Sequence, residues 1–299
     1  MAEIVFLGTS CGLPTPERNH PAIHFQYNDQ RFLFDCGENV QRQLATAKLS
    51  PMKIGRIFIT HLHGDHFFGL VGLIQSSYWR ERADALYIYG PKGMKRIIDA
   101  VLQLVEKGKA FEIIVTEVKE GVILDEEDFT VSAFPVKHNK EGFGYVFQEK
   151  ERLHADEKKL RKLGLEPGPL YGQLKAGKTV EWKGKTLKPK DYVTSEPGIK
   201  FAYTGDTEYC EATIKAADGA DLLVHEASFA QDAADRAREA THSTAKDAGL
   251  VAREANVKQL VLTHFSTRYK EDELDKLLQD AKKEFENVVL AKDFMKIEI

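Results

Sequence analysis

Cysteine is scarce in this chain: Cys11, Cys36 and Cys210 are the only three in 299 residues. No two of them lie close together in the sequence, which argues against a disulfide framework and against a zinc ribbon. So few cysteines suit a reducing compartment, and we therefore expect the protein to be cytoplasmic.

Long apolar runs are also missing. None approaches the roughly 20 residues that a membrane-spanning helix needs, and residues 1–8 lack the basic leader of a signal peptide. Hydrophobic residues make up 42% of the chain and charged residues 29%, a composition that excludes a disordered or fibrous protein. We expect a globular protein with a large core and no membrane partner.

Charge of one sign does not dominate, since the net charge is −4, but the charges are unevenly placed. Between Lys158 and Lys190 ten Lys or Arg residues stand against two Glu residues, which gives +8 for this segment and −12 for the remainder. A basic segment on an acidic body is a candidate contact for a polyanion. A solvated linker whose lysines only maintain solubility would have the same pattern, so both interpretations stay open.

The sequence is rich in metal-ligand side chains at residues 61–66, which read His-Leu-His-Gly-Asp-His. This segment follows the apolar run 54–60, which predicts a buried strand, and precedes a predicted helix from about 66 to 79. Imidazole and carboxylate groups are the ligands that zinc takes when no thiolate is used. His61 and His63 could bind one metal, and Asp65 and His66 a second. The alternative is a surface turn whose histidines occur by chance.

Further polar residues follow other predicted strands, where an α/β fold gathers ligands at one sheet edge. They are His138 after strand 129–136, Asp206 after strand 199–204, His225 and Glu226 after strand 221–224, and His264 after strand 258–263. Taken singly, each is more often a polar residue at the edge of a sheet. Together with residues 61–66 they supply the seven or so ligands that two bridged metals need.

The βα pattern, which includes a predicted strand at 85–89 and a helix at 91–107, is interrupted between about 149 and 197. A short helix is predicted near 158–163, after which glycines and prolines interrupt any long element. We expect an insertion that protrudes from the core. A structureless stretch of this length is usually either functional or disordered.

Several motifs together carry a family resemblance that runs nearly end to end. They are His61–His66, which has the form HxHxDH, Phe6-Leu7-Gly8-Thr9-Ser10, Phe34-Asp35-Cys36-Gly37-Glu38, Gly205-Asp206-Thr207, His225-Glu226-Ala227-Ser228, His242-Ser243-Thr244 and His264-Phe265-Ser266-Thr267-Arg268-Tyr269. HxHxDH is the signature of the metallo-β-lactamase fold, and the whole set resembles ribonuclease Z, a family of tRNA 3′-processing endonucleases. The segment Gly168-Pro169-Leu170-Tyr171-Gly172 is similar to the flexible arm by which that family binds tRNA.

The resemblance implies an α/β (α+β) fold, a metallo-β-lactamase αββα sandwich of two mixed sheets with outer helices. Residues 1–299 would form a single domain of this fold, with residues 149–197 as an inserted flexible arm that serves as the tRNA-binding exosite. Gly168 and Pro169 in the arm, and Arg268 in the body, are the expected substrate-binding residues. Arg268 would contact a phosphate with its planar guanidinium.

The resemblance also implies two Zn²⁺ ions per subunit, with Mn²⁺ as a substitute. His61, His63 and His138 would bind one ion, Asp65, His66 and His264 the other, and Asp206 would bridge them. Asp65 would also orient the attacking water and accept its proton.

Protonation of the leaving 3′-oxygen is assigned by the resemblance to His242, which Glu226 would keep charged. Two alternatives stay open: His242 as a residue at a helix start, and Glu226 as part of a buried ion pair. His225 should point away from Glu226 on the strand and have a structural role.

The expected function is that of a zinc-dependent endoribonuclease that removes the 3′ trailer from precursor tRNA and leaves a tRNA 3′-hydroxyl. The family implies a homodimer. One rival is another hydrolase of the same fold, acting on a small phosphodiester, ester or lactone, which would not need the basic insertion. A second rival is a non-catalytic RNA-binding scaffold.

Overall fold

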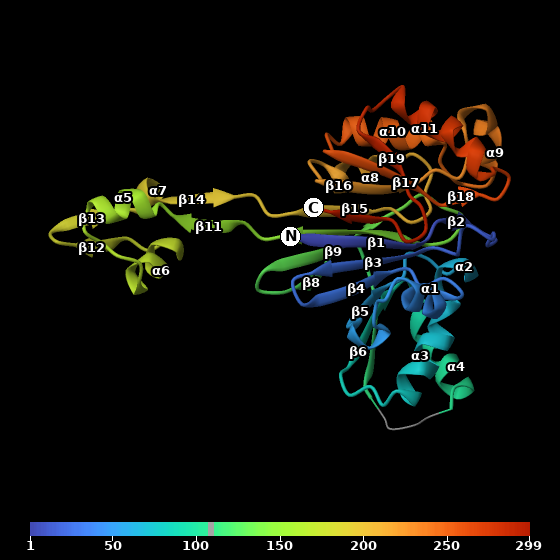
Figure 1. Cartoon of the computed structure of the whole chain (residues 1–299), viewed down its shortest axis with the longest axis horizontal. Helices are drawn as coiled ribbons and strands as arrows, with labels where there is room; N and C mark the ends of the chain where they lie inside the picture. Colours follow the sequence, from blue (N-terminus) through green and yellow to red (C-terminus); the bar gives the residue numbers. More distant parts are fainter. Residues whose placement is uncertain (107–110) are drawn as a thin grey trace. The chain divides into compact units, whose positions relative to one another are not determined.

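The computed structural model describes residues 1–106 and 111–299, which group into two compact units (Figure 1). The larger unit comprises Met1–Glu126, Thr130–Phe147 and Ile199–Ile299, and the smaller one Glu127–Phe129 and Gln148–Gly198. Among these described residues, no helix is both long and apolar enough to cross a membrane.

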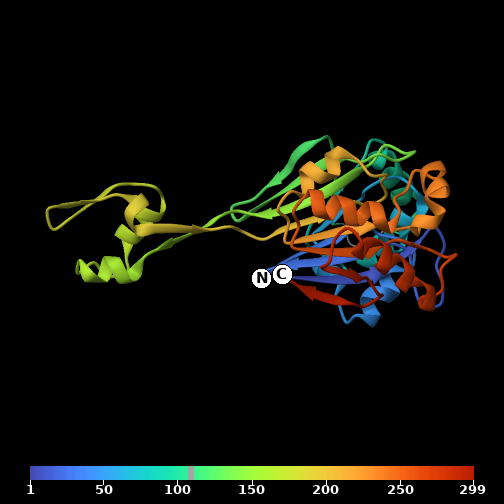
Figure 2. The ribbon, with the colours of Figure 1, turned by 90° about the horizontal axis from the view of Figure 1, so that it is seen from above.

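The first sheet of the larger unit has seven strands within the described residues. Their order is β20 (Lys296–Glu298), β1 (Ala2–Gly8), β3 (Ala22–Tyr27), β4 (Gln30–Phe34), β5 (Arg56–Phe58), β6 (Leu86–Gly90) and β7 (Ile113–Glu117). From β20 to β4 neighbouring strands are antiparallel, and from β4 to β7 they are parallel. The two termini are therefore adjacent, and the Ala2 amide donates to the Ile299 carbonyl at 2.8 Å (Figures 1 and 2).

The second sheet also has seven strands in the described part of the chain. Their order is β19 (Val288–Leu290), β17 (Gln259–Thr263), β16 (Leu222–Glu226), β15 (Lys200–Tyr203), β10 (Phe143–Glu149), β9 (Phe129–Pro135) and β8 (Gly121–Asp125). The four strands from β15 to β19 are parallel, whereas β8 and β9 are antiparallel. A short parallel pair, β2 (Ser10–Cys11) with β18 (Phe265–Ser266), joins the loops that follow β1 and β17.

Helices cover the outer face of each sheet (Figure 1). The elements associated with the first sheet are α1 (Val40–Thr46), η1 (Pro51–Lys53), α2 (Gly64–Phe67), α3 (Gly69–Trp79) and α4 (Met94–Leu104). Those associated with the second sheet are α8 (Glu211–Ala217), η2 (Gln231–Ala233), α9 (Ala234–Glu239), α10 (Ala245–Glu254), η3 (Glu271–Glu273) and α11 (Leu274–Lys282).

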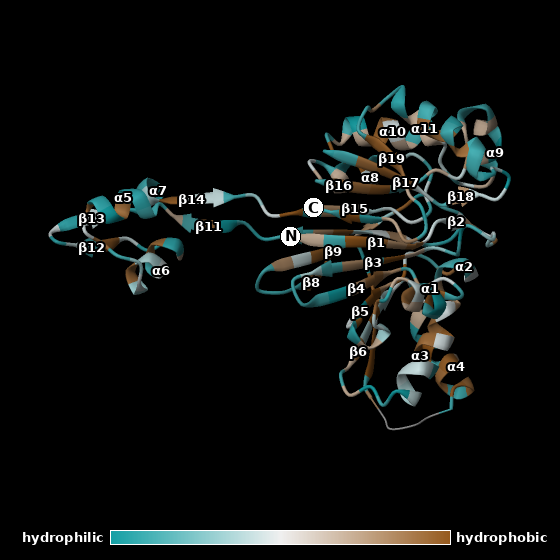
Figure 3. Ribbon diagram, viewed as in Figure 1, coloured by the Kyte–Doolittle hydropathy of each residue, from teal (hydrophilic) through white to brown (hydrophobic). Residues whose placement is uncertain are grey.

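Apolar side chains form three layers, because successive residues of a strand point to opposite faces. Val5 and Leu33 pack with the helices outside the first sheet, and Leu223 and Leu260 pack with those outside the second. Between the sheets the layer is aromatic: Phe25 stacks on Phe201 of the opposite sheet with ring centroids 5.1 Å apart, and Phe147 lies 4.7 Å from Phe25. Strands of both sheets are accordingly hydrophobic in Figure 3. The expected αββα sandwich of two mixed sheets is confirmed.

Several element boundaries differ from the predictions. The helix predicted from 66 to 79 is two helices, α2 and α3, which meet at Phe68. The helix predicted at 91–107 is α4, and its last predicted residue lies outside the described residues. Strand β8 was not predicted, because it is largely exposed and shows no alternation of apolar residues.

The smaller unit is folded, so the expectation of a structureless stretch is wrong. Its elements are β11 (Arg152–Ala155), α5 (Glu157–Lys162), α6 (Pro169–Lys175), β12 (Val180–Trp182), β13 (Lys185–Leu187), α7 (Pro189–Tyr192) and β14 (Val193–Glu196). The predicted short helix is present as α5, capped by Asp156, which accepts from the Lys159 amide. Its own core consists of Leu160, Leu165, Tyr171, Leu174, Val180 and Leu187. Proline starts a helix here instead of preventing one, since Pro169 occupies the first turn of α6.

Candidate metal centre

The predicted ligands come from the ends of strands in both sheets. His61 and His63 follow β5, and the short helix α2 then presents Asp65 and His66. From the second sheet, the ligand-type residues that follow the strands are His138 after β9, Asp206 after β15 and His264 after β17. Parallel strands end at a common edge, which brings side chains from distant parts of the sequence together.

The structure brings all seven of these side chains together. One group is His61, His63, His138 and Asp206, whose donor atoms lie within 4.8 Å of one another. The second group is Asp65, His66 and His264, within the same limit. Asp206 lies between the groups, because its Oδ2 atom is 3.5 Å from Nε2 of His61 and 3.4 Å from Nε2 of His66.

The donor atoms are arranged as a metal site requires. Nδ1 of His63 lies 2.9 Å from Nε2 of His61 and 3.2 Å from Nε2 of His138, so three ring nitrogens face one another. Burial lowers the pKa of all three histidines, which leaves the rings neutral with lone pairs to share. Oδ1 of Asp206 is buried, has no hydrogen bond among the described residues and lies 3.3 Å from Nε2 of His264. Converging imidazole nitrogens and carboxylate oxygens are ligands that zinc takes, so the residues fit a metal.

Asp35 orients one of the imidazoles, a role that the sequence analysis missed. Its Oδ2 atom lies 2.8 Å from Nδ1 of His66, so that the Nε2 atom of the same ring faces the cluster. The carboxylate also accepts from the Thr60 amide and from the Tyr203 hydroxyl, both at 2.8 Å. Such partners fix the tautomer and direction of a ligand ring. The sequence signal was the strand-end position of Asp35 after β4.

His242 and Glu226 form a pair at the edge of the cluster. Nδ1 of His242 lies 2.7 Å from Oε1 of Glu226, and that carboxylate is held by the Thr207 amide at 2.8 Å and by the Ser228 hydroxyl at 2.7 Å. Burial lowers the pKa of His242, but the Glu226 carboxylate outweighs burial and raises it to about 9.

The structure is compatible with both alternatives for this pair. Helix α10 begins shortly after His242 and is capped by Thr244 and Asp247 in a capping box. Glu226 is part of a buried ion pair, in which His242 is its partner. His225 is fully buried, with Nδ1 2.7 Å from the Glu226 carbonyl oxygen, which agrees with a structural role.

Other predicted residues are not in the cluster. The guanidinium of Arg268 lies 4.9 Å from the centroid of the Phe229 ring, and its Nε donates to the Ser266 hydroxyl at 3.3 Å. Gly168 and Pro169 belong to the smaller unit, where they form the start of α6. Gly12 was not predicted, and its amide donates to Oδ2 of Asp65 at 3.0 Å.

Comparison with family models gives two matches. Residues 2–163 match the model described as Anti-Pycsar protein Apyc1, and residues 179–265 match a beta-lactamase superfamily domain. Among solved structures, the short form of human tRNase Z is similar with a TM-score of 0.72 and 29% identity, over 99% of both chains. The metallo-beta-lactamase fold protein YhfI from Bacillus subtilis, 21% identical with a TM-score of 0.71, has the same fold over 100% of this chain and 99% of its own.

Curated relatives match over the whole chain. Ribonuclease Z of Methanothermobacter thermautotrophicus is 43% identical over 100% of this chain and 97% of its own length. Ribonuclease Z of Archaeoglobus fulgidus is 45% identical over 99% and 97%. Full-length identity at this level, with the same fold and a metal-type cluster at its edge, leads to one conclusion. The chain belongs to the ribonuclease Z family, whose fold is the metallo-β-lactamase fold.

Proposed function

We propose that this protein is a metal-dependent endoribonuclease that removes the 3′ trailer from tRNA precursors and leaves a tRNA 3′-hydroxyl. The observation that carries the proposal is the seven-residue donor set with the His242–Glu226 pair beside it. Full-length similarity to proteins named ribonuclease Z supports the choice of substrate.

The proposed metals are two Zn²⁺ ions, with Mn²⁺ as a substitute. His61, His63 and His138 would hold one ion, Asp65, His66 and His264 the other, and Asp206 would bridge them. When bound, two such ions acidify water and neutralise charge that develops on phosphate oxygens.

Asp65 is the proposed proton acceptor for the attacking water. The Gly12 amide holds its carboxylate. Burial raises the pKa of Asp65, but His66 and His264 outweigh burial and lower it below its ordinary range, so the carboxylate is ionised, as a metal ligand must be.

His242 is the proposed proton donor to the leaving 3′-oxygen. Glu226 holds its Nδ1 atom and favours the charged ring, which leaves the Nε2 proton for transfer. Arg268, which is exposed and lies over the Phe229 ring, is the proposed contact for a substrate phosphate.

The remaining assignments concern the whole chain. Residues 1–299 are proposed to be a single metallo-β-lactamase domain, with residues 149–197 as an arm that binds the body of tRNA through Gly168, Pro169 and its lysines. Lys158, Lys175 and Lys178 of this segment are exposed, as sequence-independent phosphate contacts need to be. We further propose a homodimer that acts in the cytoplasm.

The first test is cleavage of an end-labelled tRNA precursor by zinc-loaded protein, beside a variant that lacks residues 155–190. We expect a single cut next to the acceptor stem, and we expect the deletion to abolish it. No cut by protein shown to hold two metals would overturn the proposal. Hydrolysis of a small phosphodiester under the same conditions would then favour the rival hydrolase.

A further inference from the structure

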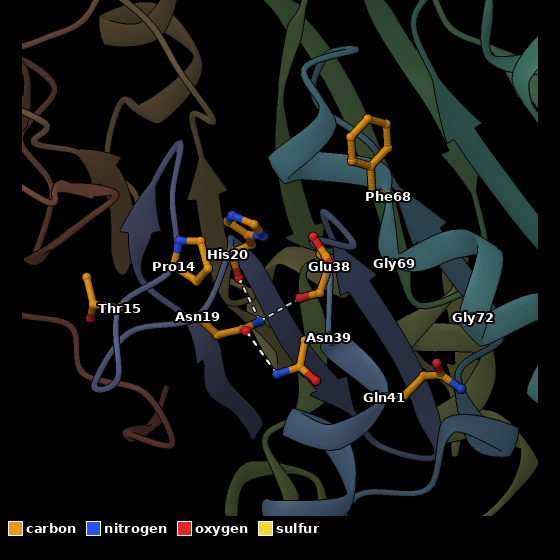
Figure 4. Close-up of a pocket in the computed structure, with 10 residues that line it drawn as sticks. All are labelled: Pro14, Thr15, Asn19, His20, Glu38, Asn39, Gln41, Phe68, Gly69 and Gly72. Atoms are coloured by element: carbon orange, nitrogen blue, oxygen red, sulfur yellow. Dashed lines mark hydrogen bonds between the residues drawn. The ribbon is translucent and has the colours of Figure 1, made fainter.

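A strained threonine lies in the turn between α9 and α10, directly before His242. Thr241 has a φ of 58°, in the left-handed region, where a branched side chain crowds the backbone of its own chain. Among the described non-glycine residues with positive φ, Thr241 is the only β-branched one. Asparagine tolerates this conformation better, as at Asn39, whose side chain donates to Asn19 at 3.3 Å (Figure 4).

The end of α9 requires the conformation of Thr241 but not its side chain. The His242 amide donates to the Ala237 carbonyl at 2.8 Å, and the Thr241 amide donates to the Arg238 carbonyl at 3.1 Å. These two bonds form a Schellman motif, in which the left-handed residue is usually glycine. Glycine would end the helix equally well, so the presence of threonine needs another explanation.

Both polar groups of Thr241 contact the loop that carries His138. The Thr241 carbonyl oxygen lies 2.8 Å from Nδ1 of His138. Because a carbonyl only accepts, Nδ1 carries the ring proton, and Nε2 keeps the lone pair that faces His63 at 3.2 Å. The Thr241 hydroxyl oxygen, 3.1 Å from the same Nδ1 atom, donates to the Ala240 carbonyl at 2.6 Å and accepts from the Asn139 amide at 3.0 Å. The threonine therefore holds both His138 and the residue after it.

The same turn carries the proposed proton donor. His242 follows Thr241 directly, and the ring centroids of His138 and His242 are 5.0 Å apart. Strained backbone persists where the surrounding contacts maintain it, and it is concentrated at functional sites. Asp35 and His264, which belong to the cluster or support it, also have positive φ, of 56° and 60°. The strain at Thr241 fits this pattern.

We propose that Thr241 is a positioning residue, which holds His138 in the direction and tautomer of a metal ligand and in register with His242. The inference rests on the proposed function, because it takes His138 as a ligand of one ion. Glycine would relax the backbone but leave the Asn139 amide without this acceptor. Metal binding and cleavage should therefore depend on the hydroxyl group, whereas stability should depend on the backbone conformation.

The test compares Thr241→Ser, which keeps the hydroxyl group, with Thr241→Val and Thr241→Gly, which lack it. Zinc affinity is measured by competition with a chromophoric chelator, precursor cleavage with zinc-saturated protein, and the melting temperature with metal-free protein. Thr241→Ser should match the wild type in zinc affinity and cleavage, whereas Thr241→Val and Thr241→Gly should both lose about tenfold in each. Thr241→Gly should nevertheless melt about 2 °C above Thr241→Val, because glycine relieves the strain and valine does not.

Lys48→Gly is the matched control. Lys48 ends α1 in the same way, with a φ of 59°, its amide bonded to the Ala45 carbonyl at 3.1 Å and the Leu49 amide bonded to the Leu44 carbonyl at 2.9 Å. Its side chain is exposed and is not part of the cluster. Replacement of Lys48 by glycine should leave zinc affinity and cleavage unchanged.

A wild-type zinc affinity in Thr241→Val would overturn the inference and leave the ribonuclease function standing. Losses that follow the melting temperature, with Thr241→Gly close to the wild type, would also overturn it, because Thr241 would then act on the fold alone. So would a Thr241→Ser protein as impaired as Thr241→Val. Failure of the zinc-loaded wild type to cleave any precursor would overturn the proposed function, whereas the zinc affinities of the three Thr241 variants would still decide the role of this residue.

Discussion

The His242–Glu226 pair is the residue-scale feature most directly open to test. His242→Ala removes the proposed proton donor without touching a proposed ligand, so cleavage should slow by roughly 10²- to 10⁴-fold while zinc content stays the same. Glu226→Gln keeps the shape of its partner and should cause a smaller loss. Single-turnover cleavage and metal analysis measure both effects. A normal rate in His242→Ala would refute the assignment.

A buried histidine that is not among the proposed site residues should make the fold acid-sensitive. His24 lies in β3, paired across the strands with Val5 and Leu33, and burial together with Arg31 and Lys296 lowers its pKa to about 4. The unfolded chain takes up this proton below about 6.5, whereas the folded one does so only near 4. Stability therefore falls as the pH drops from 6.5 towards 4.

Replacing His24 by leucine should remove this part of the acid sensitivity. Between pH 7.5 and pH 5 the two pKa values correspond to about 2 kcal/mol of unfolding free energy, which the wild type should lose and His24→Leu should keep. Urea unfolding of the metal-free proteins at both pH values measures the difference. The exposed His154 is the control position, and equal losses in wild type and His24→Leu would contradict the assignment.

At the residue scale the sequence indicated the side chains that cluster in the structure, but it did not indicate every residue that holds them in place. His61, Asp206 and His264 could be named because each follows an apolar run, and strand ends meet at one edge. Asp35 also follows a strand, β4, and was overlooked, whereas the role of Gly12 depends on a contact with Asp65, which lies 53 residues away in the sequence. A pattern within a short stretch of sequence cannot predict such a long-range contact.

At the element scale, strands were predicted better than the places where helices break. The break at Phe68 follows from close packing, because a Cβ at Gly69 would lie 2.2 Å from the carbonyl oxygen of Gly37. This contact packs α3 against a turn that lies 32 residues earlier in the chain. Hydrophobic periodicity within the helix cannot predict a contact of this kind.

The smaller unit offers an element-scale prediction, because six buried side chains make up its core. Leu174→Ala in α6 should cost about 2–5 kcal/mol, enough to unfold so small a core. Hydrogen exchange should show residues 157–192 unprotected and the two large sheets unchanged. Cleavage of precursor tRNA should fall as in the deletion variant, with hydrolysis of a small phosphodiester unaffected. Leu153→Ala, at an exposed position of β11, is the matched control, and a protected core in Leu174→Ala would contradict the prediction.

At the scale of the whole molecule, the four-layer architecture was predictable and the folded insertion was not. Strands such as β1 and β4 are nearly continuous apolar runs, which fit a sheet covered on both faces. The sandwich with outer helices was predicted from the family resemblance. The six core residues of the smaller unit are widely spaced in the sequence between Leu160 and Leu187, with glycines and prolines between them. Its apolar residues meet only after several turns have formed, so composition predicted a loop.

The proposed homodimer and the proposed arm can be tested together by mixing subunits. If the arm of one subunit presents tRNA to the site of its partner, two inactive proteins should complement each other. The deletion of residues 155–190 keeps a complete site, and His242→Ala keeps a complete arm.

The two variants are mixed in equal amounts, unfolded together and refolded with zinc. Random pairing should then make about half of the dimers heterodimers. In each heterodimer one intact arm serves one intact site, so precursor cleavage should recover to about a quarter of the wild-type rate. A mixture as inactive as its parts, with heterodimers verified by mass, would mean that each arm serves the site of its own subunit.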